Sequence, residues 1–171
     1  MSGRDPNGLI PAEGSPMSLV LGIDYSSRSV DLVFLDESTD TARWHSIPLE
    51  RGVAGARSVR QKYAWGSALD DVYLVAVEDP MSAGLTVAKQ LGRVCGAILS
   101  SLPWTLSDDL VWMLQPSEWK LACGLSGNAS KQDVARWALE RFDCGMWPQD
   151  AVDALCMAYA AREINARAVA A

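Results

Sequence analysis

Short apolar runs along the chain predict five strands. Residues 18–24 (SLVLGID) form an apolar run that ends in an acid, which is typical of a buried strand. Residues 29–36 and 41–48 predict two further strands, and together the three suggest an antiparallel meander. Residues 71–78 (DVYLVAVE) are almost continuously apolar, as in a central strand covered on both faces. A fifth strand is predicted at residues 110–114.

The remaining pattern predicts helices at residues 53–69, 85–102, 117–123, 131–142 and 151–167. The order is therefore three strands, a helix, a strand, a helix, a strand and then helices. Strands followed by alternating helices and strands predict an α/β fold, with a five-stranded mixed sheet flanked by helices. Ligands of such sheets bind beyond the strand ends.

Length and composition fit one folded domain. The chain has 171 residues, of which 49 % are apolar and 21 % charged, as in globular proteins. We expect residues 1–16, rich in Gly, Pro, Ser and charge, to form a disordered arm, and residues 17–171 to form the domain. No apolar run reaches the roughly 18 residues that cross a membrane, and no signal peptide opens the chain, so we expect a cytoplasmic protein without a membrane partner.

Cysteine usage and net charge restrict the chemistry. The cysteines Cys95, Cys123, Cys144 and Cys156 form no C-x-x-C pair, and His45 is the only histidine, so we expect buried thiols rather than a zinc site. The net charge of −6 argues against a broad basic surface for nucleic acid. Acidic metal ligands and a local basic patch can nevertheless coexist in one domain.

Four carboxylates occupy positions that could converge. Asp24 and Glu78 end two predicted apolar strands, and Asp150 and Asp153 share one face at the start of the last helix. If the two strands are neighbours and this helix packs beside them, the four acids need a counter-charge. Two Mg²⁺ or Mn²⁺ ions would supply it and would favour phosphodiester hydrolysis. Taken singly, each acid could instead be a solvated strand end or a helix cap.

The residues around these acids resemble the RuvC family of Holliday junction resolvases, part of the ribonuclease H-like superfamily. The matching blocks, in family order, are GID (22–24) with SR (27–28), VE (77–78), LG (91–92) with GA (96–97), the P…K…G…G.A.K..V pattern (116–134) and DAVDAL (150–155). Together they span most of the predicted domain.

This resemblance implies a homodimer that binds four-way DNA junctions and nicks two opposed strands, leaving 5′-phosphate and 3′-hydroxyl ends. It implies that Asp24, Glu78, Asp150 and Asp153 are catalytic and hold Mg²⁺, with two ions per site and Mn²⁺ as a substitute. It also implies that DNA is contacted by Lys120, Lys131, Arg28 and Met81, the last standing where the family has an aromatic wedge. Each lysine could instead be an ordinary solvated side chain, and Ser130 is predicted to cap the helix that follows it.

Three departures favour a divergent, phage-type member acting in a bacterial cell or phage-infected host. Tyr25-Ser26 replaces the family's Pro-Gly, Met81 replaces the aromatic residue, and the chain is acidic. An endonuclease with relaxed choice among flaps, forks and three-way junctions is therefore an alternative to a strict junction resolvase.

Two alternative functions other than a nuclease are also compatible with this pattern. A non-catalytic DNA-binding scaffold would not respond to divalent metal. An ATPase of the ribonuclease H-like fold would need Gly-rich phosphate turns, whereas residues 24–27 (DYSS) contain no glycine. For a dimer interface, the helices at 53–69 and 85–102 are candidates, although Gly92 and Gly96 on the latter would also permit close packing within one subunit.

Overall fold

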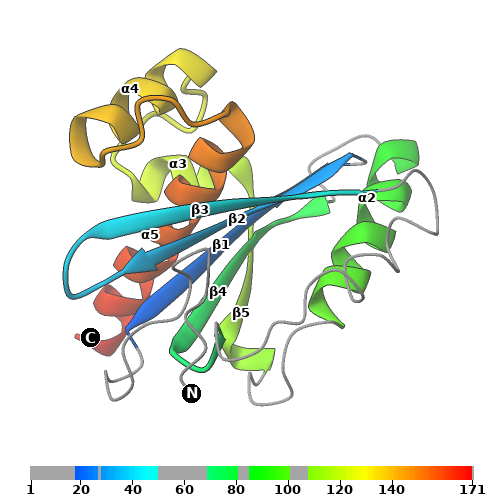
Figure 1. Cartoon of the computed structure of the whole chain (residues 1–171), viewed down its shortest axis with the longest axis horizontal. Helices are drawn as coiled ribbons and strands as arrows, with labels where there is room; N and C mark the ends of the chain where they lie inside the picture. The colour runs from blue at the N-terminus through cyan, green and yellow to red at the C-terminus, as the bar shows by residue number, and fades with distance from the viewer. Residues whose placement is uncertain (1–17, 27, 50–68, 81–84, 101–107, 171) are drawn as a thin grey trace, which may run out of the picture.

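Five strands form one mixed sheet in the computed structural model, which describes residues 18–26, 28–49, 69–80, 85–100 and 108–170 (Figure 1). The predicted arm at 1–16, the predicted helix at 53–69 except for Leu69, and Met81 lie outside these residues. The strands are β1 (Leu19–Tyr25), β2 (Ser29–Asp36), β3 (Thr41–Pro48), β4 (Val72–Glu78) and β5 (Val111–Leu114), in the order β3-β2-β1-β4-β5.

Strand directions follow from the connections. The short turns from β1 to β2 and from β2 to β3 produce antiparallel pairs, as the predicted meander requires. The pairs β1–β4 and β4–β5 are parallel. Because β1 and β4 are parallel neighbours, their carboxyl ends lie at the same edge of the sheet. The predicted five-stranded mixed sheet is thus confirmed.

Helices cover both faces of the sheet. One face is covered by α5 (Gln149–Val169), against which α3 (Pro116–Ala122) and α4 (Lys131–Arg141) pack. The other face carries α2 (Leu85–Leu99), and the short 3₁₀ helix η3 (Asp108–Leu110) precedes β5. The last helix begins two residues earlier than predicted, at Gln149 rather than Ala151, so Asp150 lies within its first turn. None of the helices in the described ranges is long and apolar enough to cross a membrane.

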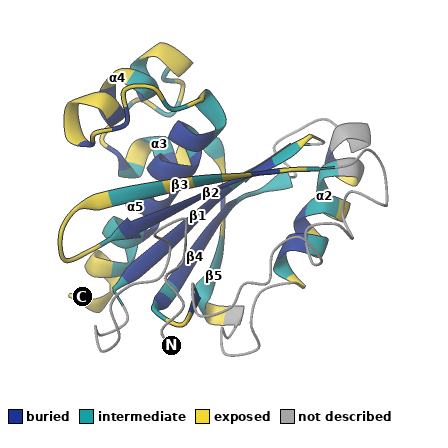
Figure 2. Ribbon diagram, in the orientation of Figure 1, coloured by how far each residue is buried: buried dark blue, intermediate teal, exposed yellow. Residues whose placement is uncertain are grey.

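Side chains of β1 alternate between two apolar cores. Leu21 and Ile23 face the α2 side, whereas Val20 belongs to the core beneath α5. Burial is deepest along β1, β2 and β4, and the edge strand β3 is more exposed (Figure 2). Both faces of the central strands are therefore covered by apolar side chains.

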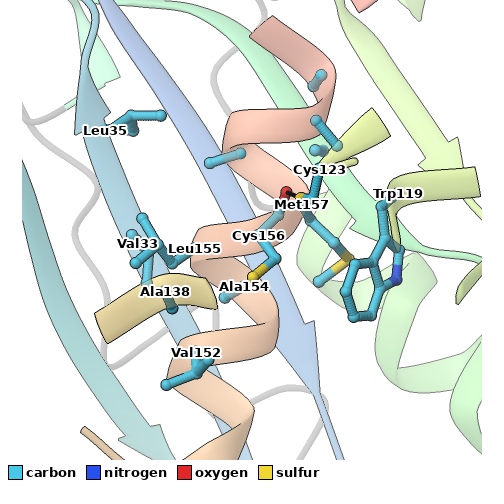
Figure 3. Packing of buried hydrophobic residues seen from close by; sticks show 14 of the residues in the cluster. Val33, Leu35, Trp119, Cys123, Ala138, Val152, Ala154, Leu155, Cys156 and Met157 are labelled. Atoms are coloured by element: carbon cyan, nitrogen blue, oxygen red, sulfur yellow. Dashed lines mark hydrogen bonds between the residues drawn. The ribbon is translucent and has the colours of Figure 1, made fainter. Parts of the chain in front are cut away.

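The α5-side core contains three of the four cysteines, and Figure 3 shows Cys123 and Cys156 within it. The Cys123 thiol donates to the Cys156 carbonyl oxygen, 3.5 Å away, and so ties α5 to the end of α3. All four cysteines are buried and free of disulfides, as the sequence predicted.

The backbone of α5 lies unusually close to β1 at Gly22. A Cβ atom at this position would lie 1.9 Å from the carbonyl oxygen of Ala154, so only glycine fits. The facing helix surface is correspondingly built from small, fully buried residues, including Ala151, Ala154 and Ala158. This contact sets the distance between the last helix and the strand that carries Asp24.

Helix α2 packs within its own subunit, as predicted, but no described residue makes the close approach that Gly92 and Gly96 would permit. A Cβ added to either glycine meets nothing within 4 Å. Both glycines therefore lie on a side of α2 that no other described element approaches closely. The helix contacts the sheet instead through Cys95 and Ile98.

Candidate functional site

Four carboxylates from three elements meet at one edge of the sheet. Asp24 lies two residues beyond Gly22 on β1 and so faces α5, and Glu78 lies two residues beyond Ala76 of the α5-side core and ends β4. Asp150 and Asp153 lie at the start of α5, which the Gly22 contact holds against β1. The strand β1 continues to Tyr25, one residue past its predicted end.

The pKa of Asp24 reflects the closeness of the other three acids. Burial and then, in decreasing order, the charges of Glu78, Asp153 and Asp150 together raise the pKa of the Asp24 carboxyl to about 8. An opposing contribution comes from the Tyr25 backbone N–H, which donates to Asp24 Oδ1 at 2.7 Å. Asp24 on β1 therefore interacts with the other three predicted site acids, which lie on β4 and α5.

Positive charge lies near Asp153. Burial raises its pKa, and this is opposed by the Gln149 amide, which donates to Asp153 Oδ1 at 2.8 Å, and then by Lys131 and Lys120. Gln149 was not singled out from the sequence. Its i, i+4 spacing to Asp153 was the available signal, since residues four apart share a helix face.

Both predicted lysines are close enough to Asp153 to lower its pKa. Lys120, on α3, donates through Nζ to the Ala129 carbonyl oxygen at 2.9 Å, and its Nζ lies 5.4 Å from the centre of the Trp119 ring. Lys131 is the first residue of α4. Arg28 is exposed in the turn that follows β1. The structure thus brings the two lysines to the acids and leaves Arg28 on the surface near the end of β1.

A capping box fixes Lys131 at the start of α4. The Ser130 hydroxyl accepts from the Asp133 backbone N–H at 3.2 Å, and Asp133 Oδ2 accepts from the Ser130 backbone N–H at 3.1 Å. The cap predicted at Ser130 is therefore confirmed.

We expect Ser130→Ala to lower the free energy of unfolding by about 1 kcal/mol, because the first turn of α4 loses its side-chain acceptor. For a domain of this size the midpoint of thermal unfolding should fall by about 2–4 °C. Ser100→Ala, at the exposed end of α2, is the matched control and should change the midpoint less. Equal effects of the two changes would contradict the assigned role of Ser130.

The donor set fits a hard divalent cation by its chemistry. Carboxylate oxygens are the preferred ligands of Mg²⁺ and Mn²⁺, and the mutual repulsion recorded at Asp24 is relieved by a cation. As the side chains stand, no three His, Cys, Asp or Glu residues of the described segments form a ready-made metal-binding group. The acids are nevertheless close enough to one another to raise the pKa of Asp24.

The mixed sheet in the order β3-β2-β1-β4-β5, with helices on its faces, is a ribonuclease H-like fold. Among solved structures, the chain is similar to RuvC from Thermus thermophilus, with a TM-score of 0.58. A structure of T. thermophilus RuvC in complex with a Holliday junction substrate gives a TM-score of 0.62. Each match covers 88 % of this chain and 96 % of the RuvC chain at 19 % sequence identity. No protein-family model and no curated protein sequence matches the chain. The resemblance inferred from the sequence is confirmed for the fold.

Proposed function

We propose that the protein is a magnesium-dependent endonuclease that cuts branched DNA, with four-way junctions as its main substrate. The observation that carries this proposal is the convergence of Asp24, Glu78, Asp150 and Asp153 on the α5 side of the sheet edge, beside two lysines. The fold supports it, because T. thermophilus RuvC, of the same fold, has been solved with a Holliday junction substrate.

The four carboxylates would hold the cations, two per site, with Mn²⁺ able to replace Mg²⁺. Bound cations would supply charge neutralisation and Lewis acidity for phosphodiester hydrolysis. Gln149 orients the Asp153 carboxylate through its hydrogen bond. Lys120 and Lys131 would attract phosphate oxygens of the substrate to the site. The Ala129 carbonyl holds the Lys120 ammonium in place for that contact.

Resolution of a four-way junction requires two cuts in opposed strands, so we propose that a homodimer presents two such sites. A two-fold dimer would place both sites in a fixed relation to the junction. The expected products are nicked duplexes with 5′-phosphate and 3′-hydroxyl ends. Sedimentation at micromolar concentration should therefore give the mass of two chains.

The decisive experiment compares cleavage of labelled four-way junctions, three-way junctions, flaps and linear duplexes in Mg²⁺. Wild type should place paired, symmetric nicks in the four-way junction. Glu78→Gln should cut at least about 100-fold more slowly, because it removes one charge from the cation site. Glu140→Gln, on the exposed face of α4, is the matched control and should behave as wild type.

The outcomes separate the alternatives. Preferred cutting of flaps or three-way junctions would favour the relaxed branched-DNA endonuclease, which the departures at Tyr25-Ser26 motivate. If Mg²⁺ stabilised the protein but no substrate were cleaved, the result would support the metal site and contradict the proposed nuclease activity. No response to Mg²⁺ or Mn²⁺ in either assay would leave a DNA-binding scaffold as the better proposal.

A further inference from the structure

Asp31 is a buried carboxylate next to the candidate site. Of the polar and charged residues in the described segments, it alone is buried, with 3 % of its surface exposed. It pairs directly opposite Asp24 in the antiparallel β1–β2 ladder, so both side chains lie on the α5 face. Burial of a carboxylate is unfavourable unless a partner compensates it. We therefore expect Asp31 to have a hydrogen-bond partner that compensates for its burial.

Its partner is an indole on the neighbouring edge strand. Trp44 Nε1 donates to Asp31 Oδ1 at 2.9 Å. Trp44 pairs opposite Val33, whose side chain belongs to the α5-side core, so the indole lies over the same face. This hydrogen bond restricts the orientation of the ring. The Asp31 carboxylate therefore points along the sheet toward β3.

The fixed indole in turn packs against the segment that leads into α5. The rings of Trp44 and Trp147 have centroids 6.1 Å apart and planes inclined by 39°. Trp147 is followed by Pro148, the N-cap residue of α5, and by Gln149, which holds Asp153. The trio Asp31, Trp44 and Trp147, here termed the indole brace, thus links β2 and β3 to the acid-bearing turn.

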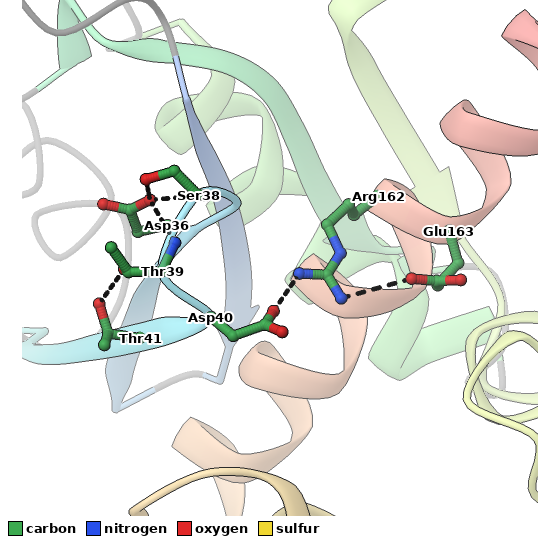
Figure 4. Close-up of polar contacts among 7 residues, drawn as sticks. All are labelled: Asp36, Ser38, Thr39, Asp40, Thr41, Arg162 and Glu163. Atoms are coloured by element: carbon green, nitrogen blue, oxygen red, sulfur yellow. Dashed lines mark hydrogen bonds and ion pairs between the residues drawn. The ribbon is translucent and has the colours of Figure 1, made fainter.

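Other contacts of α5 are distributed along the helix, and in its first turn Ala151 and Val152 are buried. Gly22 meets Ala154 one turn beyond Asp150. Near the opposite end, Arg162 forms ion pairs with Asp40 of the β2–β3 turn and, at 3.3 Å, with Glu163 (Figure 4). The brace adds a direct side-chain link from β2 and β3 to the segment that leads into the first turn of α5.

We propose that Asp31 and Trp44 are positioning residues that hold the first turn of α5 in place. This position keeps Asp150 and Asp153 close to Asp24 and Glu78. This inference deepens the proposed nuclease function and rests on it for its consequence, which is tighter cation binding. Asp31 acts through Trp44 and touches neither cation nor DNA.

Hydrogen exchange of the metal-free protein tests the positioning without requiring activity. Trp44→Phe keeps the ring and removes the donor, so the backbone amides of residues 152–155 should exchange about tenfold faster than in wild type. Amides near residues 160–165 should be unchanged, because Arg162 and Asp40 still fix that end. Trp112→Phe removes another indole donor, which contacts the Asp109 carbonyl at 3.0 Å, and is the matched control. Equal exchange in the two variants, or uniform loosening of α5, would overturn the proposal.

Mg²⁺ titration by calorimetry gives the second measurement. Trp44→Phe should bind Mg²⁺ about tenfold more weakly, as for the loss of a residue that orients a ligand. Asp31→Asn keeps an acceptor oxygen and should stay within about twofold of wild type, since a positioning role needs the hydrogen bond rather than the charge. Loss of Mg²⁺ binding in Asp31→Asn comparable to that in Asp24→Asn would make Asp31 a ligand and overturn the positioning role.

A double variant separates positioning from stability. Replacing both partners, as in Asp31→Leu with Trp44→Phe, leaves no buried group unpaired and should restore much of the thermal stability lost in Trp44→Phe. Mg²⁺ affinity should remain about tenfold reduced. Recovery of affinity together with stability would overturn the proposal. If wild type binds no Mg²⁺, the proposed function fails, while the exchange experiment still decides whether the brace positions α5.

Discussion

Asp24→Asn is expected to raise the stability of the metal-free protein while removing its response to magnesium. Burial and the charges of Glu78, Asp153 and Asp150 raise the pKa of Asp24 to about 8, which means that the folded state disfavours the ionised carboxylate. Asparagine has nearly the same shape and carries no charge. Above pH 8, in a chelator, the variant should gain about 2 kcal/mol, or roughly 4–8 °C in the unfolding midpoint.

The pH dependence has a definite sign. Because the folded pKa lies above the unfolded value, the folded protein binds this proton more tightly, and the contribution to stability is greatest below about pH 4. That contribution is lost as the pH rises toward 8. The difference between Asp24→Asn and wild type should therefore be small at pH 4 and largest at pH 8. Glu140→Gln, exposed on α4, should show no such trend.

Added Mg²⁺ should reverse the order of stability. A cation that binds only the folded state stabilises wild type in proportion to the logarithm of its concentration, whereas Asp24→Asn lacks one ligand and should gain little. Thermal unfolding at pH 8 with and without Mg²⁺ measures both effects. A variant less stable than wild type in the chelator would show that the four acids do not repel one another in the folded protein.

The sequence predicted the elements of this fold well because its periodicities are simple. The bounds of β2 and β3 match the predicted strands. Asp24 and Glu78 were predicted as site acids from apolar runs that end in a carboxylate, and Asp150 and Asp153 from their spacing of three at the start of a helix. The close approach at Gly22 was not deduced from the pattern, because a glycine within an apolar strand has several uses. It required the position of Ala154 in space.

The contribution of Asp31 was also hidden in the sequence. In the run SVDLVFLD, an acid at an alternating position is typical of a solvated strand face, yet here it is buried. Its hydrogen-bond donor, Trp44, comes from a different strand, and the ring that packs on Trp44, Trp147, comes from a distant loop. Local patterns report which face a side chain occupies, whereas the partner on that face is set by tertiary packing.

Gly22→Ala is expected to destroy the native packing of α5. The added Cβ would lie 1.9 Å from the Ala154 carbonyl oxygen and 2.9 Å from its carbon, and a helix backbone cannot rotate away as a side chain can. The helix must move as a unit, which opens the core and carries Asp150 and Asp153 away from Asp24. We expect a loss of about 3 kcal/mol or more in unfolding free energy by denaturant titration. Cleavage activity should be lost as well.

The control for this change lies on α2. Gly96→Ala adds the same methyl group where nothing lies within 4 Å, and it should stabilise the protein by about 0.5–1 kcal/mol because alanine favours the helix. Ala154→Gly should not rescue Gly22→Ala, because the obstructing atom belongs to the backbone. Rescue by that second change, or a Gly22→Ala protein as stable as wild type, would mean that β1 and α5 are farther apart than the structure shows. The spacing of the acids would then be set by some other contact than this glycine.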